Sequence, residues 1–256
     1  MPGLESLSPW GYAWVVTVLL AAGFIHGMIG LGFPLIAMPL LALALPFKSA
    51  ILFILLPMLF VNVTIAFHGG GLRQSIARFW YMPLAPLAGA WMGTRLLIHA
   101  PPEPFVLLLA LMLIVYLLRE RFGRAEVPLV RRNATAFGIA AGLVGGFFES
   151  VTNISLPPLI IFLMMLGVSP MAMVQILNFS SIGTKAVQIG GWTISGGVPW
   201  TFWLASLPWA VATTAVLFAG ARIRMRVSTT RYMVWLRRFL WAMALMLVIQ
   251  FAVSIG

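Results

Sequence analysis

Two ionisable side chains stand within otherwise apolar stretches of the chain, where a charge must find a partner. Glu149 lies in the run GFFESVTNISLPPLI (146–160), and Lys185 lies in an apolar segment over about 171–190. Burying a charge is costly unless the charge is paired and hydrogen-bonded. Lys185 is therefore either the countercharge of a bound anion or one half of a buried ion pair with Glu149, and both interpretations stay open.

Lys185 belongs to a row of polar residues. Spacings of three and four positions predict that these residues share one face of a helix: Gln175, Asn178, Ser181, Lys185 and Gln188. Asn178, Ser181 and Gln188 would then orient the oxygens of an anion beside Lys185. An anion that competed with Glu149 for Lys185 would couple its own binding to protonation of Glu149.

Two apolar runs are interrupted by residues that break helices. The run GFIHGMIGLGFPLI (23–36) contains His26, Gly30 and Gly32, and the later run contains three polar residues before its prolines: Thr152, Asn153 and Ser155. A helix N-terminus offers unpaired N–H donors and partial positive charge, so these breaks predict backbone donors for an anion. Close helix packing through glycine is the alternative explanation. Histidine titrates near neutrality in water, so His26 either relays protons, as Glu149 could, or only bonds the backbone.

The composition places these residues in a membrane. Hydrophobic residues make up 62% of the 256 residues and charged residues 8%, and the mean hydropathy is +1.04. Because a soluble domain carries roughly 25% charged residues, we predict an all-α integral membrane protein. The excess of 16 Lys and Arg over 5 Asp and Glu lies between the apolar runs. Such charge orients a membrane protein and does not indicate a nucleic-acid partner.

The chain divides into two related series of about five apolar segments each. A basic linker over 119–132 separates them, and we place the boundary between an N-terminal half, 1–125, and a C-terminal half, 126–256. Shifting 23–37 by 123 positions onto 146–160 needs no gap and keeps three identical residues. The two halves are therefore predicted to be an internal repeat.

The same shift aligns His26 with Glu149 and Asn62 with Lys185. Of the first-half residues that correspond to the polar row, only Asn62 is polar. The binding chemistry is therefore predicted to lie mostly in the second half.

Loop charges predict that the two halves are inverted. After the third segment, Arg73 and Arg78 mark the first loop, and its counterpart over 190–200 is uncharged. After the fourth segment, the first loop carries only Glu103, and its counterpart over 221–238 carries six arginines. Basic loops stay cytoplasmic, so equivalent loops face opposite sides and both termini are extracytoplasmic.

Inversion needs an odd number of crossings per half: five full crossings, or three with a re-entrant hairpin. We favour broken or re-entrant helices at the start of each half, because the second segments are shorter than the roughly 20 residues of a span.

The interrupted runs resemble the motifs of a transporter family. The stretches GFIHGMIGLGFPLIAMPLL (23–41) and GLVGGFFESVTNISLPPLIIFLMMLGVSP (142–170) are similar to the duplicated glycine-rich entry motifs of the TauE/SafE-type sulfite exporter, or anion permease, family. The resemblance implies transport of small anions, such as sulfite and organosulfonates, across the bacterial inner membrane. Where the family carries more consecutive glycines, this chain has Gly30-Leu31-Gly32 and Asn153-Ile154-Ser155.

The sequence therefore predicts a secondary transporter of a small anion that works by alternating access between two inverted repeats. The expected partners are the anion and the lipid bilayer, and a homo-oligomer is compatible with the sequence. The candidate binding residues are Lys185, Asn178, Ser181, Gln188, Asn153, Ser155, Thr152, Asn62, Gly30 and Gly32. The candidates for proton coupling are Glu149 and His26. An anion channel and a non-transporting scaffold subunit are the alternatives. The sequence contains no catalytic or cofactor motif and no cysteine, so we expect neither an enzyme nor a cofactor or metal site.

Overall fold

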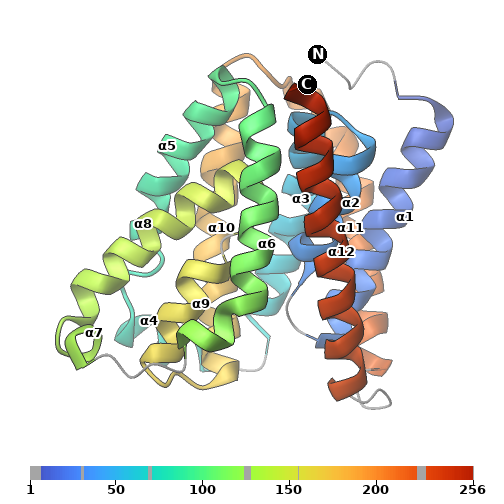
Figure 1. Cartoon of the computed structure of the whole chain (residues 1–256). Helices are drawn as coiled ribbons and strands as arrows, with labels where there is room; N and C mark the ends of the chain where they lie inside the picture. The colour runs from blue at the N-terminus through green and yellow to red at the C-terminus, as the bar shows by residue number, and fades with distance from the viewer. Residues whose placement is uncertain are drawn as a thin grey trace.

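The computed structural model describes residues 7–29, 32–68, 71–123, 128–154, 156–223 and 229–255, and within these ranges the regular structure is helical. The first series is α1 (Pro9–Ile29), α2 (Phe33–Ala44), α3 (Phe47–Ala66), α4 (Leu72–Arg78), α5 (Ala85–His99) and α6 (Glu103–Gly123). The second series is α7 (Pro128–Arg132), α8 (Ala134–Thr152), α9 (Leu156–Met165), α10 (Pro170–Ile194), α11 (Trp200–Ile223) and α12 (Thr229–Ile255) (Figure 1).

The helices have the lengths and composition of a multi-pass membrane protein. Within the described ranges, five apolar helices are long enough to cross a bilayer: Pro9–Met28, Phe47–Ala66, Ala134–Thr152, Trp200–Ile223 and Val234–Val253. The second helix of each series is short, with 12 residues in α2 and 10 in α9. At 1.5 Å per residue, α2 extends about 18 Å, well below the roughly 30 Å of a hydrocarbon core.

Both predicted helix breaks lie where the sequence places them. Gly32 is the N-cap residue of α2 and has a φ of 116°. Asn153 is the C-cap residue of α8 and has a φ of 59°. Asn153 is the one non-glycine residue with positive φ in the described part of the chain. Left-handed backbone is open to glycine and tolerated by asparagine, so these residue types allow the chain to turn at these points.

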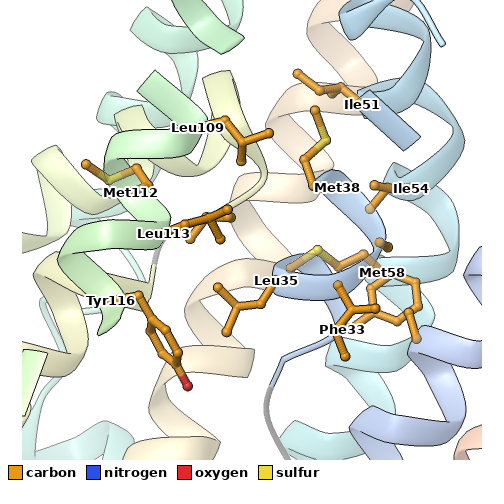
Figure 2. Packing of buried hydrophobic residues seen from close by; sticks show 14 of the residues in the cluster. Phe33, Leu35, Met38, Ile51, Ile54, Met58, Leu109, Met112, Leu113 and Tyr116 are labelled. Carbon is orange, nitrogen blue, oxygen red and sulfur yellow. The ribbon is translucent and has the colours of Figure 1, made fainter. Parts of the chain in front are cut away.

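The short helix α2 lies in the middle of the protein. Nine of its 12 residues are buried. Figure 2 shows its side chains facing two other helices, with residues of α2 (Phe33, Leu35, Met38), α3 (Ile51, Ile54, Met58) and α6 (Leu109, Met112, Leu113, Tyr116). Protein therefore surrounds the helix that follows the first break, as membrane depth requires of irregular backbone.

The two series pack in corresponding ways. α1 packs against α11 as α5 packs against α8, α3 against α11 as α10 against α5, and α6 against α9 as α12 against α2. In each comparison, the helices of one series are replaced by the helices at the corresponding places in the other series. The start of α1 and the end of α12 lie at one end of the molecule, and α7 lies at the other (Figure 1). The division into 1–125 and 126–256 and the inverted repeat both stay predictions.

Two segments differ from the sequence-based expectation. The fourth apolar segment, expected from about residue 79, becomes helical only at Ala85. Pro83 disfavours helical backbone in the residue before it and has no N–H to donate, so residues 79–84 form turns instead. The preceding loop contains the short helix α4.

Glycines allow the closest helix pairs to approach. A Cβ built on Gly27 of α1 would overlap the carbonyl oxygen of Leu217 on α11. A Cβ on Gly89 of α5 would overlap the carbonyl oxygen of Leu143 on α8. Small residues commonly allow such backbone contact between membrane helices.

We predict that Gly89→Ala destabilises the protein, because the new methyl group must push α5 from α8. Overpacking of this kind costs about 1–3 kcal/mol. Gly190→Ala is the matched control, because a Cβ on Gly190 in α10 meets no atom within 4 Å. The control should lose no stability, since alanine favours a helix over glycine by about 1 kcal/mol. Thermal unfolding midpoints in detergent measure both, and equal effects would contradict the packing argument.

Candidate functional site

Lys185 is the centre of a buried polar cluster. Its Nζ lies 2.7 Å from Oδ1 of Asn153, 2.9 Å from Oε1 of Gln188 and 3.3 Å from Oε1 of Glu149. The four residues are at most 1% exposed. Asn153 and Gln188 each accept a hydrogen bond from the ammonium, and Glu149 supplies the opposite charge, although its Oε1 has no hydrogen-bond partner among the described residues.

The second helix break positions this cluster. The N–H of Asn153 donates to the carbonyl of Glu149 at 2.8 Å and closes the last turn of α8. Asn153 itself has left-handed backbone, and its side chain reaches α10, where Oδ1 accepts a hydrogen bond from Lys185. The Asn153 Nδ2 donates to the carbonyl of Ile51 on α3 at 3.4 Å. One asparagine therefore contacts both halves of the chain.

Two further residues secure the same break. Gln188 follows Lys185 by one turn of α10, and its Nε2 donates to the carbonyl of Ser150 at 2.9 Å. The Thr152 hydroxyl donates to the carbonyl of Phe148 at 2.7 Å and accepts from the N–H of Ile154 at 3.2 Å. The end of α8 is thus bonded to α10 and to itself.

The first break has a different polar partner. The N–H of Phe33, the first residue of α2, donates to Nδ1 of His26 at 3.0 Å, and His26 is 3% exposed. A second proton on this imidazole would break that hydrogen bond, because Nδ1 is already an acceptor. His26 thus bonds the backbone in this state, and its predicted role in proton coupling stays a prediction.

Several predicted binding residues lie outside the Lys185 cluster. Asn178 is two turns away on α10, and its Nδ2 donates to the carbonyl of Val174 in its own helix at 2.8 Å. Ser181 is one turn away and buried. Asn62 is about 16 Å along α3 from Ile51, at 1.5 Å per residue. Gly30 and Ser155 lie outside the described residues.

The predicted polar row on α10 is buried throughout, with exposed fractions from 0 to 5%. Sequence reasoning missed the backbone acceptors of the cluster, the carbonyls of Ser150 and Ile51. Every residue has a carbonyl, so no sequence signal could have found them. The Lys185–Glu149 contact agrees with the ion-pair interpretation, and binding of an anion to Lys185 stays a prediction.

The apolar helices, with buried charges and interrupted helices among them, define a multi-pass membrane protein. The chain matches the family described as sulfite exporter TauE/SafE over residues 15–251, nearly its whole length, and belongs to that family. No curated protein and no solved structure matches the chain. Among the described residues, no three His, Asp or Glu side chains gather as metal ligands.

We predict a strong energetic coupling between Glu149 and Lys185. Glu149→Gln leaves a buried ammonium without a countercharge, and Lys185→Met leaves a buried carboxylate. Removing one partner of a buried pair costs about 3–5 kcal/mol. The double variant should regain much of this loss, because it buries neither charge.

Stability of the two single variants and the double variant, measured by denaturant or thermal unfolding in detergent, completes the cycle. Glu103→Gln at the start of α6 is the control carboxylate, and it should change stability by no more than about 0.5 kcal/mol. Additive single effects would show that the two charges do not interact.

Proposed function

We propose that this protein is a secondary transporter that carries a small sulfur oxyanion, an organosulfonate or a small carboxylate across the bacterial inner membrane by alternating access. Membership of the exporter family supports the classes of protein and substrate. The observation that carries the proposal is the pair of breaks at Gly32 and Asn153. Each leaves backbone groups beside buried polar side chains, and interrupted helices at corresponding places in two halves are typical of a transporter's binding site.

In the described arrangement, Lys185 Nζ bonds Asn153 and Gln188 and forms an ion pair with Glu149, whose Oε1 has no hydrogen-bond partner among the described residues. An anion that reached the ammonium would displace Glu149, whose oxygen is the most distant of the three acceptors. A buried carboxylate without its partner favours the protonated form. In this proposal, Glu149 therefore takes up a proton when the anion binds, and His26 is the second candidate for proton coupling.

In this proposal the two halves move relative to one another, and the hydrogen bonds at the Lys185 cluster differ in length within and across the halves. Within the second half, Lys185 bonds Asn153 at 2.7 Å and Gln188 bonds Ser150 at 2.9 Å. Across the halves, Asn153 reaches the carbonyl of Ile51 only at 3.4 Å. At this site, a movement of one half against the other would break the longer bond first and leave α8 and α10 joined.

We further propose that both termini are extracytoplasmic, because the arginine-rich loops mark the cytoplasmic side. The location of the start of α1 and the end of α12 at one end of the molecule supports a shared side (Figure 1).

Counterflow in proteoliposomes tests the proposed function. Vesicles loaded with one unlabelled anion would be assayed for uptake of the labelled anion, using sulfite, sulfate, methanesulfonate and acetate, with and without a pH gradient. We expect saturable exchange of one anion class. Passive flux without counterflow would instead identify a channel. The absence of flux from folded protein would favour a scaffold subunit.

We predict that Lys185→Ala and Asn178→Ala reduce this exchange about tenfold or more, since each removes a donor worth roughly 1.5–3 kcal/mol to a charged acceptor. Asn178→Ala is the safer variant for folding, because its amide bonds only its own helix. Thr94→Val on α5 is the control, because Thr94 is buried but belongs to none of the candidate sites. Wild-type exchange of every anion by both alanine variants would contradict binding at this face of α10.

A further inference from the structure

Three buried side-chain donors of the first half lack an acceptor among the described residues, and two of them belong to His26 and Asn62. The Nε2 of His26 and the Nδ2 of Asn62 have no hydrogen-bond partner among the described residues, and the two side chains are 3% and 2% exposed. Because Nδ1 of His26 accepts the N–H of Phe33, the neutral ring carries its proton on Nε2. Both orphaned atoms are therefore N–H donors, and a buried donor without an acceptor costs about 1–3 kcal/mol.

These two residues correspond to the ion pair of the second half. The shift of 123 positions aligns His26 with Glu149 and Asn62 with Lys185. Glu149 and Lys185 lie 3.3 Å apart, so these two positions face one another across α8 and α10. The second half thus supplies its own anion, the Glu149 carboxylate. At the matching position, the first half has an imidazole instead.

The packing of the first half agrees with this placement. His26 is on α1 and Asn62 on α3, and these helices contact each other. Phe33, which bonds His26, lies in the same packed group as Met58, one turn before Asn62 on α3 (Figure 2). A Cβ built on Gly32 would meet no atom of the described residues within 4 Å. The N-terminus of α2 adds partial positive charge there.

We propose that a monovalent oxyanion binds between His26 and Asn62 at the start of α2, in the place that the Glu149 carboxylate takes in the second half. This inference rests on the proposed function. It adds a second anion position, in the first half, to the one proposed beside Lys185, and it assigns the charge class. Its donors are neutral, so the site balances a single negative charge only through oriented dipoles. A dianion would bring a second, uncompensated charge into an apolar protein. Hydrogensulfite, an alkanesulfonate or a carboxylate fits, and sulfate does not.

The binding test uses purified full-length protein, with methanesulfonate and sulfate as probes in a thermal-unfolding titration. Asn62→Leu removes the Nδ2 donor. His26→Asn removes the Nε2 donor of the imidazole, while Oδ1 of the new side chain can still accept from the N–H of Phe33. We expect each variant to bind methanesulfonate about tenfold more weakly or worse, in keeping with a lost bond to a charged group. Thr94→Val is the matched control, because its hydroxyl is also buried and lacks a partner among the described residues, but it lies on α5. It should bind like wild type.

Asn62→Leu also separates binding from a structural role. Without an anion, it should unfold at the wild-type temperature or above, because it removes an unsatisfied buried group. A lower unfolding temperature without anion would overturn the proposal, since Asn62 would then have a structural partner. Wild-type affinity for methanesulfonate in both variants would also overturn it. Tighter binding of sulfate than of methanesulfonate would overturn the charge class.

The site and the proposed function fail in distinguishable ways. If wild type exchanges an anion in counterflow but the variants retain wild-type affinity, the transporter stands and this site is wrong. If wild type binds methanesulfonate as expected but exchanges nothing, the site stands and the transport proposal is wrong. If wild type binds neither probe, only water satisfies the two donors, and the inference is overturned.

Discussion

The structure depends on satisfying the backbone where its helices stop inside an apolar protein. At membrane depth, free N–H and C=O groups are tolerated only where protein covers them or where they line a polar cavity. At the first break, His26 accepts the N–H of Phe33, and at the second, Thr152 accepts the N–H of Ile154. Each solution fixes a polar side chain beside a helix end. The groups that stabilise the breaks therefore also furnish the candidate site.

The neighbouring helices cover these breaks. A helix as short as α2 cannot hold its position by spanning the bilayer, so it depends on burial against α1, α3, α6 and α12. Figure 2 shows its contacts with α3 and α6. Elsewhere in the bundle, glycines such as Gly27 and Gly89 admit a neighbouring backbone between α1 and α11 and between α5 and α8. Replacing these contacts with larger side chains would widen the bundle and reduce the cover over the polar interior.

Local backbone chemistry and one possible partner of Lys185, Glu149, could be predicted from the sequence, and the other partners of the cluster could not. Glycine, asparagine and proline mark both breaks, and regular spacing marks the buried polar face of α10. The partners of Lys185 depend on how α8 lies against α10, which no local pattern specifies. Asn178 shares a face with Lys185, but two turns separate them, and its amide bonds Val174 instead. A shared helix face is a weaker condition than a shared site.

The two halves differ at the positions that a repeat would bring together. If both halves carried a lysine and a glutamate there, each ammonium would meet a carboxylate of the protein, and no buried donor would be left for an anion. Among the described residues, His26 and Asn62 instead leave two donors unsatisfied, each at a cost of about 1–3 kcal/mol. In the proposed transporter, a bound anion recovers that free energy, so the protein without an anion is less stable than the protein with one. The Lys185 pair meanwhile keeps α8 and α10 joined. The two halves of the proposed transporter therefore differ in what they offer an anion: neutral donors in the first half and an ion-paired lysine in the second.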